Sequence, residues 1–352
     1  MAVQKVAADP TLERVDVQRA GVAGAAAQFG SRARSAKRKQ PVAYLFLLPA
    51  LLVLIVFSFF PLFYAFYISL HQWKLRQGAY IALANYGRAL HTVDFWEAFG
   101  NTVYFVIGTV PVTMALALLM AYLLFQKVHF LSFFRTVYFL PYVTSTVAAA
   151  AIWVWIFNAR TGVLNQVLKA LFGPESMLRW LQESKGIIGM LAAHVGLTLP
   201  HWLQGPSLAL TSIMVMSCWH LIGFDIVLFL AGLGAINREL YEAARIDGAG
   251  EGAIFRRLTL PLLSPTIFFL TVISTIGAFK TFNEIYVMSS SAGVGNTAGG
   301  PLNSTQTMVV YIYNLFYSSR ELGFGSAVAF LLFGVILVLT LVQLWLGRRS
   351  TD

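Results

Sequence analysis

Six long apolar segments constrain this 352-residue chain more than any other feature. A helix needs about 20 mostly apolar residues to cross the hydrocarbon core of a bilayer, and each segment is long enough. Open sheet edges leave backbone polar groups unsatisfied in lipid, so we expect every segment to form a helix. The sequence therefore predicts an all-α integral membrane protein with six transmembrane helices, at about 42–70, 99–125, 136–158, 208–232, 261–287 and 325–347.

Composition and charge support a membrane protein whose termini both lie in the cytoplasm. Charged residues make up 11% of the chain, against about 25% in an average protein, and the mean hydropathy is +0.70. Cytoplasmic loops carry an excess of Lys and Arg. With the N-terminus inside, sixteen of the 25 Lys and Arg residues are cytoplasmic, Lys280 falls in the fifth segment, and eight are external. The external residues are Lys74, Arg76, Arg88, Arg160, Lys169, Arg179, Lys185 and Arg320.

Residues 1–41 differ in composition from the rest and are expected to form a basic, disordered cytoplasmic tail. No apolar run precedes Val42, and the first segment is too long and too distant for a cleaved signal peptide, so we expect an uncleaved anchor. The basic residues at 32–39 either attract anionic lipid head groups, at ~1 kcal/mol each, or only fix the topology. The net charge of +10 thus argues for membrane orientation and gives no support to nucleic-acid binding. The six-helix membrane domain is 42–352.

The long external loop after the third segment contains a further apolar run, Gly186 to Leu199. It is short for a crossing, carries His194 and ends at Pro200, so we interpret it as an external or interfacial helix. The alternative is a seventh span. It would reverse every later segment and place Arg256 and Arg257 outside, against the charge rule.

A polar stretch at about 237–261 separates the fourth and fifth segments and contains several glycines. A short helix there would carry charges on one face beside residues with almost no side chain, so a second protein could approach it closely. These residues are Arg238, Glu242 and Arg245, beside Ala243 and Ala244. Gly248, Gly250 and Gly252 then turn the chain, and Pro261 opens the next apolar segment where a missing N–H is harmless. The stretch predicts a helix-turn-helix elbow at the membrane face.

At this elbow the chain resembles a known family, the permeases of ATP-binding-cassette (ABC) importers. The matching residues of the family's EAA loop are Glu242-Ala243-Ala244, Asp247-Gly248 and Leu260-Pro261. Further stretches resemble the sugar-importer branch: Trp219, Gly223-Phe224, Ala231-Gly232-Leu233, Pro265, Phe279 to Tyr286, Pro141 to Asn165 with Trp153, Gly162 and Asn165, and Gly299-Gly300-Pro301. The resemblance covers roughly 42–347. Relative to the family, about 173–199 is an insertion that either contacts a binding protein or only lengthens the loop.

In this family the EAA loop forms a coupling helix that rests in a cleft of a separate ATP-binding subunit. The resemblance therefore implies that Glu242 pairs with a basic residue of that subunit, while Ala243 and Ala244 permit a close fit. Gly248 is expected to make the turn, and Asp247 to cap the second short helix. Closure of the ATP-binding subunits would then move the transmembrane helices between inward-open and outward-open states.

The same resemblance implies a complex in the cell inner membrane. Its other members would be a second homologous permease subunit, two cytoplasmic ATP-binding subunits and an external solute-binding protein. This chain has no G-x-x-x-x-G-K-[ST] phosphate loop. We therefore expect ATP and Mg to be bound by the partner subunits, and we expect this chain to need no cofactor and not to be an enzyme.

Polar residues inside the later segments are candidates for a solute path, because such residues are costly in a membrane. Aromatic residues beside them could stack on the apolar face of a sugar ring while amide and carboxylate groups bind its hydroxyls. The candidates are Trp219, Phe224, Asp225, Phe279, Lys280, Phe282, Asn283, Glu284 and Tyr286. Alternatively, Lys280 and Glu284 form an ion pair at i and i+4, and Asp225 lies near an interface or meets a partner helix.

Two other classes of function fit the sequence less well than a sugar-importer permease. A self-sufficient secondary carrier usually contains two related halves, and no internal repeat is visible. A membrane enzyme would need a catalytic constellation, but the single cysteine, Cys218, and six histidines show no CxxC or HExxH spacing. Among importers, a glycerol 3-phosphate or other polyol permease is the alternative. Only Lys280 offers a cation in the later segments, so a neutral sugar is favoured.

Overall fold

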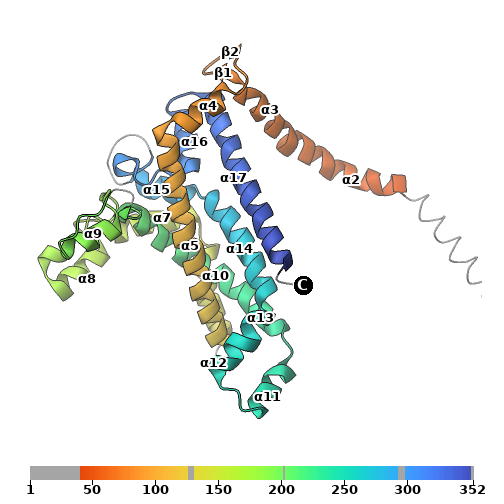
Figure 1. Cartoon of the computed structure of the whole chain (residues 1–352), viewed down its shortest axis with the longest axis vertical. Helices are drawn as coiled ribbons and strands as arrows, with labels where there is room; N and C mark the ends of the chain where they lie inside the picture. The colour runs from red at the N-terminus through yellow and green to blue at the C-terminus, as the bar shows by residue number, and fades with distance from the viewer. Residues whose placement is uncertain (1–39, 126–130, 201–202, 292–297, 350–352) are drawn as a thin grey trace, which may run out of the picture. The chain divides into compact units, whose positions relative to one another are not determined.

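The computed structural model describes residues 40–125, 131–200, 203–291 and 298–349 (Figure 1). The chain divides into two compact units, residues 1–65 and residues 66–352, which are described separately below. The described residues are mostly helical, with one small sheet. Among the described residues, five helices are long and apolar enough to cross a membrane, and one bent helix pair passes the same test together.

The first unit contains most of the first apolar segment as continuous helix. α2 (Gln40–Leu54) passes through a π-helical turn (Ile55–Phe59) into α3 (Phe60–Ser69). The π-turn comes just before Pro61. In a regular α-helix the proline ring would clash with the carbonyl of residue i−4, and proline has no N–H to donate. A wider turn accommodates both effects.

Two long helices form the centre of the second unit. α5 (Val93–Phe125) and α10 (Leu208–Ala235) pack against each other, with small residues such as Ala117 and Ala121 fully buried. α14 (Ser264–Phe279) packs against α5, and α17 (Leu322–Arg349) packs against α14. Two buried hydroxyls on α5 donate to carbonyls one turn earlier, Thr102 Oγ1 to Ala98 at 2.7 Å and Thr109 Oγ1 to Phe105 at 2.6 Å. These bonds satisfy polar groups in the apolar core.

The third apolar segment is not a straight span. α6 (Leu131–Val143) and α7 (Thr146–Ile156) meet at a 93° bend. The predicted single helix at 136–158 is therefore wrong in its geometry. Pro141 lies in the last turn of α6, where it removes a backbone donor, and Thr144 Oγ1 donates to the Pro141 carbonyl at 2.6 Å. The hydropathy of the sequence shows that both halves are apolar, but it does not predict the angle between them.

The fifth segment is also interrupted. α14 ends at Phe279, and α15 (Asn283–Ser290) begins after a break of three residues. A further short helix, α16 (Met308–Tyr317), packs against α5 and α17. It was not predicted from the sequence. The Thr102 hydroxyl of α5 accepts the backbone N–H of Met308 at 2.8 Å, which satisfies one free donor at the start of α16.

A small sheet lies at the end of the second unit opposite the elbow (Figure 1). β1 (His71–Trp73) and β2 (Gln77–Tyr80) pair antiparallel, and α4 (Ala84–His91) follows them. The all-α prediction missed this hairpin, because strands of three and four residues are too short to give a readable alternation. Arg88 of α4 forms a 2.7 Å salt bridge with Glu321, just before α17.

The loop between α7 and α10 contains short helices, α8 (Val163–Phe172), the 3-10 turn η2 (Pro174–Ser176) and α9 (Ile187–His194). The predicted helix within 186–199 is confirmed, and α9 is too short to cross a membrane. Asn165 is completely buried, and its amide oxygen accepts the indole N–H of Trp180 at 2.8 Å. Its amide nitrogen donates to the carbonyls of Ala159 and Leu178. Asn165 thus holds this loop in place.

Candidate functional site

The elbow at 237–261 is a helix-turn-helix, as the sequence predicted. α11 (Arg238–Ile246) is capped by the Asn237 side chain, which accepts the N–H of Glu239 at 3.1 Å. Gly248 then adopts a φ of +80°, a left-handed conformation that favours glycine. The chain returns through α12 (Glu251–Ile254), a π-turn η4 (Phe255–Thr259) and α13 (Leu260–Leu262), which leads into α14.

Most of α11 faces away from the rest of the protein. Glu242, Ala243 and Asp247 are exposed, Ala244 is half-buried, and Ile246 is 85% exposed. Only Tyr241 is buried on this helix. Glu242 has no hydrogen bond or salt bridge among the described residues, so its carboxylate is free to bind a partner. Ile246 was not among the residues predicted from the sequence, because its exposure is visible only in the structure.

Arg245, in contrast, already has a partner within the elbow. Its Nε lies 3.1 Å from Glu251 Oε1, and both side chains are more than half exposed. The hydroxyl of Tyr122, on α5, donates to Glu251 Oε2 at 3.4 Å. The Arg245–Glu251 pair therefore joins α11 to α12, and Glu251 in turn connects the elbow to α5 through Tyr122.

The predicted capping role of Asp247 is wrong. Asp247 is the C-cap residue directly after α11, and its side chain is exposed. The second short helix begins at Glu251, with Gly250 at the N-cap and no side-chain cap. Three residues separate Asp247 from Glu251, which puts the carboxylate too far along the chain for the cap position.

Leu260 and Pro261 lie where the elbow joins α14. The N–H of Leu260 bonds to the carbonyl of Phe255, five residues earlier, which defines the π-turn. Pro261 follows directly, so this π-turn precedes a proline just as the one at Ile55–Phe59 does. The same steric cause accounts for both wide turns.

The solute-path candidates on α10 lie beside aromatic residues of the bent pair. Trp219 is 41% exposed, and its ring lies 5.6 Å from that of Trp153 on α7. Phe224 stacks on Tyr142 of α6 at 4.9 Å. Nε2 of His220 is 3.4 Å from the carbonyl of Thr144, at the bend itself.

The candidates on α15 lie in a second aromatic group. The rings of Phe282 and Tyr286 stack at 5.1 Å, and each lies about 5 Å from Tyr313 of α16, at 5.1 and 5.0 Å. Asn283 is exposed beside them, and Glu284 is half-buried near Ser217 and His220 of α10. Tyr313 and Ser217 were not among the solute-path residues predicted from the sequence. The described structure therefore brings Trp219, His220 and Glu284 to neighbouring positions on α10 and α15.

Three other candidates do not join that group. Lys280 is the exposed C-cap residue directly after α14, and no salt bridge joins it to Glu284 among the described residues, because the helix breaks between them. Asp225 is 3% exposed within α10 and has no hydrogen bond or salt bridge in the described part of the chain. Phe279 packs with Phe95 and Tyr311 in an apolar cluster.

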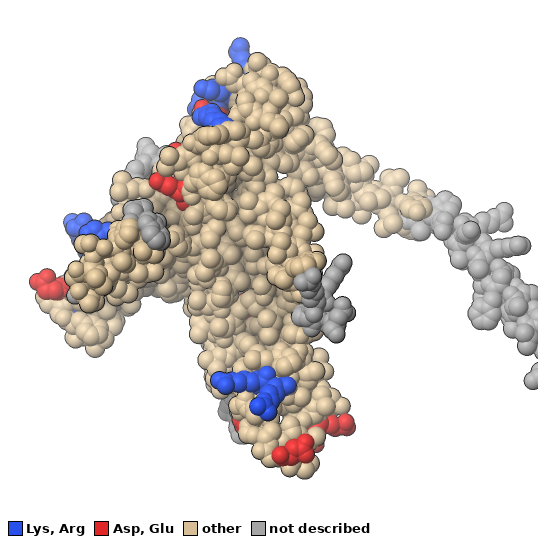
Figure 2. Space-filling model, viewed as in Figure 1, with Lys and Arg blue, Asp and Glu red and all other residues tan. Residues whose placement is uncertain are grey.

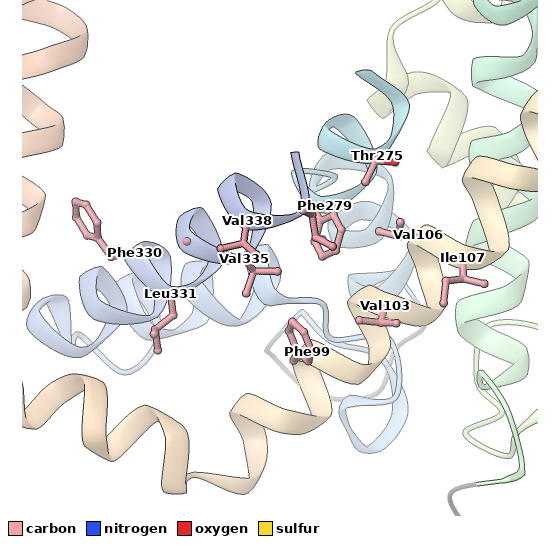
Figure 3. A pocket seen from close by; sticks show the side chains of 12 residues that line it. Phe99, Val103, Val106, Ile107, Thr275, Phe279, Phe330, Leu331, Val335 and Val338 are labelled. Carbon is pink, nitrogen blue, oxygen red and sulfur yellow. The ribbon is translucent and has the colours of Figure 1, made fainter. Parts of the chain in front are cut away.

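Phe279 also lines an apolar cavity of about 700 Å³ between α5, α14 and α17 (Figure 3). Thr275 contributes the only polar side chain among the twelve residues that line it. A sugar needs many hydrogen-bond partners, and burying its hydroxyls without them is costly. This cavity therefore does not have the chemistry of a sugar site, despite its size. Among the described residues, no group of three or more His, Cys, Asp or Glu side chains is placed to hold a metal ion.

Charge divides the second unit as a membrane would. Figure 2 shows basic and acidic atoms around the elbow and at the opposite end, with a broad uncharged surface over α5, α14 and α17 between them. Together with the long apolar helices, this arrangement defines a polytopic helical membrane protein that carries a polar elbow between two spans.

The chain belongs to the family described as binding-protein-dependent transport system inner membrane components, whose model matches residues 113–352. It is 32% identical over 308 residues to the lactose transport system permease protein LacF of Rhizobium radiobacter, covering 87% of this chain and 94% of that protein. It is 30% identical to the sn-glycerol-3-phosphate transport system permease protein UgpA of Agrobacterium fabrum, covering 85% and 92%. The resemblance to the sugar-importer branch of ABC permeases is thus confirmed.

The fold has a solved counterpart. A crystal structure of a bacterial alginate ABC transporter, in complex with a periplasmic protein bound to an alginate pentasaccharide, contains a chain with a TM-score of 0.70. It is 22% identical in sequence, and the match covers 91% of this chain and 98% of that chain. The likeness extends to nearly the whole permease fold.

Proposed function

We propose that this chain is one permease subunit of an ATP-driven, binding-protein-dependent importer of a neutral sugar or oligosaccharide. The observation that carries the proposal is the elbow, where a short helix presents Glu242, Ala243 and Ile246 outward with a free carboxylate. A helix of this kind fits a groove of a second protein. The chain would form half of the translocation path and would receive mechanical work through the elbow from a separate ATP-binding subunit.

The elbow would lie in the cytoplasm, with both termini on the same side. Arg256 and Arg257 are exposed on η4, beside the elbow turn. Two arginines next to a span favour the cytoplasmic face, and ATP is available there. The opposite end, with the hairpin β1–β2 and the loop that contains α8 and α9, would face the solute-binding protein.

The remaining members of the complex would be a second homologous permease and two ATP-binding subunits. Helix α10 exposes Trp219, and α15 exposes Asn283. Exposed aromatic and amide groups in membrane spans need a cavity or a protein partner, because lipid offers no hydrogen bonds to them. A second permease that faces α10 and α15 would enclose a path lined by both subunits.

The aromatic group on α15 and α16 supports a sugar as the solute. Phe282, Tyr286 and Tyr313 offer ring faces, and Asn283 and Glu284 offer hydrogen-bond partners nearby. An sn-glycerol 3-phosphate permease is the second candidate, favoured by the exposed Lys280 and by the relative that carries that name. Lys280 is the only Lys or Arg within 208–235, 264–290 and 322–347. A doubly charged phosphate needs more positive charge than one lysine provides.

The proposal is tested by replacing the free carboxylate of the elbow. Glu242→Lys reverses the charge of an exposed residue that has no partner in the described structure, so folding and membrane insertion should be preserved. Affinity purification of the complex should then recover less of the ATP-binding subunits. Glu175→Lys, an exposed position on η2 far along the chain from the elbow, is the matched control. Full retention of the ATP-binding subunits by Glu242→Lys would contradict the coupling role.

A further inference from the structure

Tyr241 is the side chain through which α11 contacts the body of the protein. It is 7% exposed, and its ring lies 6.1 Å from that of Phe125 at the end of α5. Its hydroxyl lies 3.3 Å from Oγ1 of Thr259, the last residue of the π-turn η4. Tyr241 immediately precedes Glu242, so one face of α11 binds the protein body while the next residue points outward.

Thr259 connects this contact to the backbone of the π-turn. It is completely buried, and its hydroxyl donates to the carbonyl of Ile254 at 3.4 Å. With that proton committed, Thr259 Oγ1 accepts from the Tyr241 hydroxyl. A chain of hydrogen bonds therefore runs from α11 through two buried hydroxyls to the residue that precedes η4.

The π-turn η4 lies between the elbow and α14, so a change in its geometry would shift and rotate α14 relative to the elbow. A π-turn holds one more residue than an α-helical turn. Converting it to α geometry would advance the helix that follows by about 1.5 Å and rotate it by about 100°. The Pro261 ring favours the wide form, and the Tyr241–Thr259 contact holds one end of it.

A second connection from α11 is weaker. The Arg245–Glu251 ion pair is 3.1 Å long, but its side chains are 54% and 57% exposed. Exposed pairs contribute about 0–1 kcal/mol and are screened by salt. The Tyr241–Thr259 contact is longer, at 3.3 Å, but both residues are buried, so neither water nor salt competes with it. A displacement of α11 is therefore passed on mainly through Tyr241.

We propose that Tyr241 is a positioning residue that transmits movement of α11 to the π-turn η4 and so to α14. Tyr241 touches neither ATP nor solute, and it acts through Thr259. The inference rests on the proposed function, since α11 moves only when an ATP-binding subunit drives it. Tyr241 on α11 and Thr259 at the end of η4 are in direct contact, and this contact then determines how much of the movement reaches α14.

The test measures the movement itself in the complete complex. Cys218 is the only cysteine, so a Cys218→Ser background allows spin labels at Leu119→Cys on α5 and Phe269→Cys on α14, both exposed positions. The distance between the labels is measured without nucleotide and with Mg-ATP and vanadate. Tyr241→Phe and Thr259→Val each remove one hydroxyl and keep the shape of the side chain. Each should abolish the nucleotide-dependent shift in distance while the complex retains its ATP-binding subunits.

Controls separate transmission from stability. Thr259→Ser keeps the hydroxyl and should restore the shift, and Tyr80→Phe, on β2 outside the elbow, should leave it unchanged. The double variant should behave like either single variant, because both interrupt one connection. A normal shift in Tyr241→Phe overturns the proposal, as does loss of the folded complex in both hydroxyl variants. If instead Glu242→Lys retains the ATP-binding subunits, the proposed function fails and not this inference alone.

Discussion

The elbow and the aromatic region at the predicted solute path are built in different ways. The elbow is one uninterrupted stretch, 237–261, in which a capped helix and a glycine turn bring sequence neighbours together. The aromatic region comprises the two groups described above, Trp153 of α7 with Trp219 of α10 and Tyr286 of α15 with Tyr313 of α16. Local chemistry determines the first region. The second exists only because distant helices pack in one particular way.

The largest expected effect comes from a substitution that disturbs that packing. A Cβ on Gly223 of α10 would overlap the carbonyl oxygen of Tyr138 and lie 3.1 Å from Cα of Phe139, both on α6. These are backbone atoms, so α6 itself must shift to make room. Gly223→Ala should therefore destabilise the protein by about 3 kcal/mol, measured as a lower unfolding temperature of the purified chain.

Gly234→Ala provides the control on the same helix. A Cβ there meets nothing within 4 Å, and alanine favours helix over glycine by up to about 1 kcal/mol. This variant should be as stable as the parent or slightly more stable. Equal stability of the two alanine variants would mean that α6 and α10 tolerate separation, and the aromatic region would then not depend on close packing.

The same contrast explains how much the sequence alone could predict. The elbow, its glycine turn and the long apolar helices follow from runs of adjacent residues, and the structure contains these elements, although the third segment is bent and the fifth is interrupted. The prediction that Asp247 caps the second short helix was wrong, because three residues separate Asp247 from Glu251, where that helix begins. Tyr313 was not predicted because α16, at ten residues, is too short to be recognised as a span from the sequence. Phe279 looks equivalent to Phe282 in sequence, yet the break after α14 separates them, and Phe279 joins an apolar cluster.

A smaller effect is expected from Tyr313→Ala, which tests whether the aromatic region binds solute. The change removes ring contacts with Phe282, Tyr286 and Tyr317, which lie 4.6 to 5.1 Å away. An aromatic pair contributes about 0.5–1.5 kcal/mol, so the KM for uptake should rise up to about tenfold. Uptake is measured in vesicles with lactose and with sn-glycerol 3-phosphate. Retention of the ATP-binding subunits should not change, since α16 is remote in sequence from the elbow.

Tyr313→Phe keeps the ring and provides the comparison for that variant. If stacking is what matters, this variant should import with nearly the parental KM. An unchanged KM in Tyr313→Ala would remove α16 from the solute path. The aromatic region would then be a packing feature between α15 and α16.

The smallest effect is expected at the exposed ion pair of the elbow. Glu251→Gln removes the charge that faces Arg245 but keeps an oxygen for the Tyr122 hydroxyl. Because both side chains are more than half exposed, the loss in unfolding free energy should stay below about 1 kcal/mol. It should also shrink as salt is raised, since the Debye length falls from about 10 Å at 0.1 M to about 3 Å at 1 M. Unfolding of the purified variant and parent at these two ionic strengths measures both quantities. A loss that exceeds this value and persists at 1 M salt would mean that Glu251 is held more tightly than its exposure indicates, and that the elbow has two strong connections to the spans and not one.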